Sequence, residues 1–232
     1  MIKKLYTQQK MDTVSIINNY PKAHKILFFL LGIDLIFVLL HFYSLSLPMS
    51  DATRNLRLDM DFGYAEMFQY IKFICVATLL AVMFFKRKLW IYVIWSLFFL
   101  FLFADDAFSF HEAVGGDIAE IFNLQGVMGL RSRDLGELVF VGLIGLSFMF
   151  FFLFALIRGS KKTKQITIHF ILLMGVLVFF GVGIDMLHSV LIKMPGSGIL
   201  TIIEDWGEML ATSLILWYSV YLFLEQKKYS KN

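Results

Sequence analysis

Six long runs of mainly apolar residues divide the chain, and the short segments between them carry most of its charges. The runs extend approximately over residues 26–45, 64–85, 89–113, 135–157, 166–192 and 200–224. A helix that crosses a bilayer needs roughly 20 apolar residues, because the hydrocarbon core is about 30 Å thick and each helical residue advances about 1.5 Å. No run alternates with the period of a barrel strand. The pattern therefore predicts an all-α bundle of six transmembrane helices that forms a single transmembrane domain over residues 1–232.

The composition excludes a water-soluble domain. Hydrophobic residues make up 59% of the 232 residues, aromatic residues make up 17%, and the mean hydropathy is +0.74. A soluble domain of this size needs more polar side chains to cover its surface. The single cysteine, Cys75, lies inside an apolar run, which excludes a disulfide framework. We expect the first run to be a retained span and not a signal peptide, because about 25 mostly polar residues precede it.

The basic residues indicate how the helices are oriented. Of the 21 lysines and arginines, 15 precede the first run, join runs two and three, join runs four and five, or follow the last run. Lysine and arginine favour cytoplasmic loops, so both termini are predicted to be cytoplasmic. The acids have the opposite distribution, with 15 of 18 carboxylates in the other loops or at the helix ends beside them. We expect a plasma-membrane protein with an acidic cluster on its extracytoplasmic side.

The third run ends in four ionisable groups: Asp105, Asp106, His111 and Glu112. If the helix continues to residue 113, Asp105, Ser109 and Glu112 share one stripe at about 100° per residue, and His111 lies to one side. Asp105 then lies roughly 24 Å along a span of about 30 Å. An unpaired carboxylate at that depth costs roughly 2.5–3.5 kcal/mol or more. We therefore expect a compensating partner.

The fifth and sixth runs carry further donors at the same depth. Asp185 and His188 are three residues apart, and the next pair, Glu204 and Glu208, is four residues apart, so each pair shares a helix face. Oxygen and nitrogen donors on several helices of a bundle suit a divalent ion, here zinc or iron. The predicted metal ligands are Asp105, His111, Glu112, Asp185, His188 and Glu208, and the predicted catalytic carboxylates are Glu204 and Asp106.

A purely structural interpretation of these charges stays open. The acids of the cluster can hydrogen-bond to one another or pair with Arg131, Arg133 or Lys72 and so brace the bundle. His111 and Glu112 can equally form a solvated helix end. Asp134 with Glu137 fits a helix N-cap and capping box better than a pair of ligands.

Two charges are predicted near mid-membrane, where charge is costly. They are Asp34 in the first run and Lys72 in the second. Lys72 can reach the interface by extending its side chain, but we favour a pair with Asp34 or with the acids of the cluster. Such a pair would balance charge or act as a gate.

Three functions follow from this pattern. The first is a metal-dependent enzyme that acts on a lipid or lipid-linked substrate, with the lipid bilayer as its surroundings. The second is a transporter or channel for protons or cations, although the predicted inner half offers hydroxyls and His169 but no carboxylate. The third is a non-catalytic sensor or assembly factor. Nucleic-acid binding is not expected, because the basic segments are short and the topology explains them.

Overall fold

The computed structural model describes residues 21–192 and 194–229, with side chains as far as Glu225. Of these residues, 84% are helical and none forms a strand. The elements are α2 (Pro21–Leu45), α3 (Asp51–Arg54), α4 (Tyr64–Arg87), α5 (Trp90–Phe108), α6 (Phe110–Ile121), α7 (Ser132–Arg158), α8 (Lys161–Val178), the π-helix η1 (Phe179–Ile184), α9 (Asp185–Leu191) and α10 (Ser197–Tyr229). With α8, η1 and α9 counted as one continuous helix, six helices in the described part are long and apolar enough to cross a membrane. The predicted all-helical architecture with six long apolar helices is confirmed.

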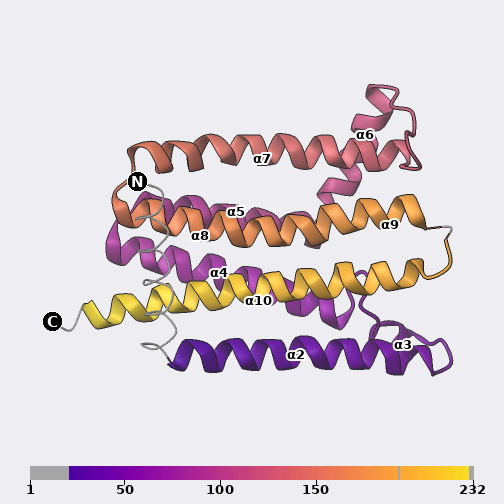
Figure 1. Ribbon diagram of the computed structural model, residues 1–232, viewed down its shortest axis with the longest axis horizontal. Coiled ribbons are helices and arrows are strands. Elements are labelled where there is room, and N and C mark those ends of the chain that lie inside the picture. The colour runs from indigo at the N-terminus through magenta and orange to yellow at the C-terminus, as the bar shows by residue number, and fades with distance from the viewer. Residues whose placement is uncertain (1–20, 193, 230–232) are drawn as a thin grey trace, which may run out of the picture.

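The six long helices run antiparallel in one bundle. Figure 1 shows α7 at one edge and α2 at the opposite edge, with α10 between α2 and α8. Helices α4 and α5 pack against each other, and α6 packs against α7. Successive long helices alternate in direction, so α3, α6 and the connection from α9 to α10 lie together at one end of the bundle (Figure 1).

The two ends of the bundle differ in charge. We call the end that carries α3 and α6 the acidic end, because a cavity lined by carboxylates, described below, lies there. The opposite, basic end holds the turn at residues 86–88 and the turn at residues 158–164, which contain seven lysines and arginines. Four of the lysines that were predicted to be cytoplasmic, Lys3, Lys4, Lys10 and Lys231, lie outside the described residues.

An aromatic cluster fills the half of the bundle nearer the basic end. The ring of Trp95 on α5 stacks on Phe152 of α7 with centroids 4.0 Å apart, and it lies 4.9 Å from Phe170 of α8. Phe170 also meets Tyr218 of α10 at 5.0 Å. Each such pair adds about 0.5–1.5 kcal/mol beyond the burial of its area. The cluster therefore joins four helices through tight ring packing.

A buried ion pair crosses the middle of the bundle. Lys72 Nζ of α4 lies 3.1 Å from Asp34 Oδ1 of α2, and the two residues are 1% and 0% exposed. The same ammonium donates to the Met209 carbonyl at 2.8 Å and to Ser213 Oγ at 3.2 Å, both on α10. Ser213 Oγ donates to Asp34 Oδ2 at 2.6 Å. The expected pairing of Lys72 with Asp34 is therefore present, and all three ammonium hydrogens have acceptors.

The end of the third long helix differs from the prediction. Helix α5 stops at Phe108, because Ser109 adopts a left-handed conformation with φ of 49°. Residues 110–113, expected in the same helix, begin α6 instead. The stripe predicted to hold Asp105, Ser109 and Glu112 is therefore wrong. The physical reason is local, since the Asp105 side chain accepts the free backbone N–H of His111 and so stabilises a new helix start.

Candidate metal site in an acidic cavity

A cavity of about 600 Å³ lies at the acidic end. Its lining comes from every long helix except α2, together with α6 and the connection at residues 58–61. Eleven of the lining residues are carboxylates: Asp59, Asp61, Glu66, Asp105, Asp106, Glu112, Glu137, Asp185, Glu204, Asp205 and Glu208. The basic groups of the lining are two arginines and two histidines. The cavity therefore carries a large excess of potential negative charge.

The arginines at the cavity are already paired. Arg131 contacts Asp134 Oδ1 at 2.7 Å, and Arg133 donates to Glu137 Oε1 at 2.9 Å and also to Glu112. Asp134 accepts the backbone N–H of Arg131 as the third residue of α7. Arg131 is the N-cap, so the capping box lies one turn earlier than the expected box of Asp134 with Glu137. Glu112, a predicted ligand, is bound to Arg133 in this arrangement. Glu112 and Glu137 are thus the cavity acids that these two arginines bind.

Asp105 and His111 form the best-defined contact of the cluster. Asp105 Oδ1 accepts the His111 backbone N–H at 2.8 Å, and Asp105 Oδ2 lies 3.2 Å from His111 Nδ1. This hydrogen bond, with the negative charge of Asp105, raises the pKa of His111 to about 9. A carboxylate that holds one ring nitrogen also orients the imidazole, as in many metal-ligating histidines.

Asp106 completes a compact group with this pair. One potential ligand atom from each of Asp105, Asp106 and His111 lies within 4.8 Å of the others. It is the one such group found among the described residues. Two carboxylates and one imidazole are a ligand set that zinc or iron accepts, with positions left for water or substrate.

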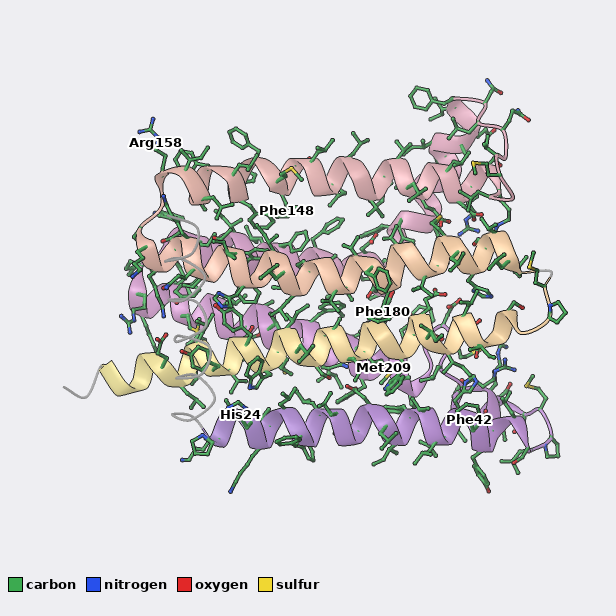
Figure 2. The ribbon with its side chains drawn as sticks, viewed as in Figure 1. His24, Phe42, Phe148, Arg158, Phe180 and Met209 are labelled. Carbon is green, nitrogen blue, oxygen red and sulfur yellow. The ribbon has the colours of Figure 1, made fainter. Side chains whose placement is uncertain are left out.

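A π-helix brings the fifth long helix close to α10. Helix α8 passes into η1, and π-turns of this kind occur often at functional sites. A Cβ on Gly181 of η1 would lie 2.1 Å from Glu208 Oε1, so a larger residue would displace that carboxylate. On α10, a Cβ on Gly207 would lie 2.1 Å from the Phe180 ring. Figure 2 shows Phe180 between the two helices. The glycines therefore permit the close approach.

Three carboxylates of α10, Glu204, Asp205 and Glu208, line the cavity near this contact. Gln69 Nε2 of α4 donates to Glu208 Oε2 at 3.0 Å. His188 Nδ1 lies 3.5 Å from Glu204 Oε2, too far and too poorly aligned for a good hydrogen bond. Glu204 Oε2 and Asp205 Oδ2 are buried atoms without a hydrogen-bond partner among the described residues. Buried oxygens that lack a partner are costly, and a bound cation would satisfy them.

Residues 27–223 match the model of a family described as "Domain of unknown function (DUF8692)". The chain belongs to this family. The matched region contains every residue that lines the cavity, so the cavity lies within the DUF8692 domain. Comparison with curated proteins and with solved structures gave no match.

All eight residues predicted as ligands or catalytic groups line this one cavity of the DUF8692 domain: Asp105, Asp106, His111, Glu112, Asp185, His188, Glu204 and Glu208. Their arrangement differs from the predicted one in two respects. The compact group contains Asp106, which was assigned to catalysis, and Glu112 is paired with Arg133. Asp34 and Lys72 pair with each other outside the cavity. The roles of all these residues stay predictions.

The predicted ligands and catalytic groups left out several polar residues of the cavity. Asp205 was passed over because its neighbour Glu204 shares a helix face with Glu208. Glu66 and Gln69 of α4 also line the cavity, and Gln69 binds Glu208. Their spacing of three residues on one apolar helix was the available signal. The π-turn has no clear sequence signature beyond its two glycines.

Proposed function

We propose that this chain is an integral membrane protein whose acidic cavity faces the extracytoplasmic side of the plasma membrane. The six long apolar helices support insertion into the lipid bilayer. The lysines and arginines of the turns at residues 86–88 and 158–164 support a cytoplasmic basic end, because such residues favour cytoplasmic loops. Both termini are then cytoplasmic.

We further propose that the cavity binds a divalent cation, either zinc or iron. One observation carries this proposal: Glu66, Asp106, Asp185, Asp205 and Glu208 line a single cavity, and none has a lysine, arginine or histidine within 4.0 Å among the described residues. Carboxylates at membrane depth are expensive unless they are paired, protonated or bound to a metal. Asp105, Asp106 and His111 are the proposed first ligands.

The function we infer is metal-dependent hydrolysis of a lipid or lipid-linked substrate. A divalent ion held there would supply a water whose pKa is lowered toward neutrality. Glu204 is the proposed general base, because its Oε2 atom is buried in the lining without a hydrogen-bond partner.

Transport is the weaker candidate. A permeation path needs polar groups at successive depths. Between the cavity and the basic end, Lys72, Asp34 and Ser213 are joined by hydrogen bonds to one another. Beyond them lies the aromatic cluster around Trp95, which is 0% exposed. This packing favours a cavity that serves one leaflet.

Elemental analysis of the purified protein tests the metal proposal. We expect about one equivalent of zinc or iron or more in the wild type. Asp106→Asn and Glu208→Gln should lose the metal, whereas Asp117→Asn, an exposed acid on α6, should keep it. A wild type without metal, or metal that survives both cavity substitutions, would contradict the proposal.

Reconstitution separates enzyme from transporter and sensor. The protein is placed in vesicles of total membrane lipid, and lipid mass spectrometry follows the consumption of any lipid species. We expect turnover that needs metal and is lost in Glu204→Gln. Proton or cation flux abolished by Asp34→Asn would support transport instead, and metal binding with neither turnover nor flux would support a sensor.

A further inference from the structure

The cavity has two chemically different parts. Its acidic part carries the carboxylates described above with the arginines and histidines, and a second part of its lining is hydrocarbon. The apolar part is formed by Leu102 of α5, Leu138 and Val141 of α7, and Met174 and Leu177 of α8. These residues lie toward the middle of their helices, whereas the carboxylates lie near the acidic end. The cavity is therefore amphipathic along the bundle axis.

Helices α7 and α8 both contribute apolar side chains to this part of the lining. Val178 at the end of α8 lines the cavity and is 49% exposed. Residues farther along α7, such as Leu143 and Leu146, are 56% and 63% exposed and apolar. A surface of this composition faces lipid in a membrane.

The aromatic cluster lies beyond Val141, the last residue of α7 that lines the cavity. Phe148 of α7 meets Phe98 of α5 with centroids 4.6 Å apart, and the Trp95–Phe152 stack lies one turn farther along. Figure 2 shows Phe148 directed from α7 into the bundle. From Arg131, the N-cap of α7, to Val141, the first and last lining residues on this helix, α7 advances about 15 Å. That length, with a volume of about 600 Å³, fits one chain with its head group better than two chains.

The charge of the acidic part selects the head group. Both arginines of the lining already bind carboxylates, so an anionic phosphate would meet unpaired acids and no free cation among the described residues. One bound divalent ion neutralises only part of this charge. A cationic amine, in contrast, is attracted to the acids that lack partners.

We propose that the cavity binds a long-chain amine or an amine-bearing lipid, with one hydrocarbon chain between α7 and α8 and the ammonium at the acidic end. The inference rests on the proposed function, since it names the substrate class of the same site.

Photolabelling in vesicles tests this proposal. The full-length protein is reconstituted in phosphatidylcholine vesicles with a diazirine-bearing long-chain alkylamine, and labelled residues are mapped by mass spectrometry. The matched probe is the alkyl phosphate with the same diazirine chain. We expect the amine to label Val141 and Met174 at least about tenfold more than the phosphate does, and excess plain alkylamine to suppress that label. Equal labelling by both probes, or label confined to lipid-facing residues such as Leu146, would overturn the proposal.

A pair of variants on α7 provides the control. Val141→Trp should fill the apolar part of the cavity and abolish the cavity label, whereas Leu143→Trp, at an exposed position of α7, should preserve the label. Metal content is measured on the same samples. Metal without the amine label refutes the amine proposal alone, and the amine label without metal refutes the proposed metal function alone. The comparison of probes on the wild type stands even if Val141→Trp fails to fold.

Discussion

Gly181 of η1 lies directly against the carboxylate of Glu208 on α10, with room for nothing larger than a hydrogen. A Cβ at position 181 would fall 2.1 Å from Glu208 Oε1. The atom in the way is the far end of a flexible side chain, so a substitution would move Glu208 and leave the backbone in place. The contact therefore couples the π-turn to the candidate metal site.

Gly181→Ala is expected to reduce metal affinity by about tenfold or more, because the displaced carboxylate also loses its hydrogen bond from Gln69. Thermal unfolding should change little. The matched control is Gly175→Ala on α8, where a new Cβ meets nothing within 4 Å. That variant should keep its metal and gain helix stability of up to about 1 kcal/mol. Equal metal titrations for the two variants would refute the coupling.

Lys72→Met should destabilise the protein strongly. It leaves Asp34, which is 0% exposed, with a buried charge that lacks its cation. Breaking one side of a buried pair costs about 3–5 kcal/mol. The double variant Lys72→Met with Asp34→Leu removes both charges and should recover most of the loss. Unfolding in detergent checks this, and a single variant as stable as the wild type would show that the pair is dispensable.

The metal-free protein should lose stability in alkaline solution. The folded pKa of His111 is raised to about 9 from 6.5, mainly by its hydrogen bond to Asp105. Protonated His111 therefore stabilises the fold fully below pH about 6.5, and this contribution disappears as the pH rises through about 9. The unfolding temperature of metal-free protein should fall over that window. In metal-free His111→Gln the unfolding temperature should stay constant over the same pH range. A fall as steep as that of the wild type would exclude His111 as the group responsible.

The packing of α6 on α7 depends on two glycines. A Cβ on Gly136 would lie 1.9 Å from the Gly115 carbonyl oxygen, which is backbone and cannot rotate away. Gly136→Ala should therefore cost about 1–3 kcal/mol. It should also increase proteolysis near α6. Gly142→Ala on the same helix, where nothing lies within 4 Å, should lose no stability and should keep the protease sensitivity of the wild type. Similar protease sensitivity in the two variants would argue against this contact.

The six long helices could be predicted because each one is indicated by the apolar composition of its own residues. Runs of about 20 apolar residues leave few alternatives in a bilayer. The pairing of Lys72 with Asp34 could also be predicted, because a charge buried near mid-membrane is unfavourable in free energy unless it has a partner of opposite charge. Helix ends were less predictable. The end of α5 depends on Ser109 in a left-handed conformation, which few non-glycine residues adopt.

The cavity itself could be predicted only as a set of residues at similar depth. Helical spacing indicated that Asp185 and Glu208 lie near the same end, but it did not show which acids the arginines bind. Arg133 lies between Glu112 and Glu137 because α6 folds back onto α7, a contact that no local pattern encodes. Asp205 lines the cavity although it lies one residue from the predicted face, because a wide cavity collects neighbouring helix positions.

X-ray absorption at the metal edge of the purified wild-type protein tests the central claim most directly. We predict a first shell of oxygen and nitrogen ligands with at least one imidazole and no sulfur, supplied by Asp105, Asp106 and His111. That signal should be absent from Asp106→Asn. Protein without bound metal, or a shell that contains sulfur or survives unchanged in Asp106→Asn, would contradict the account.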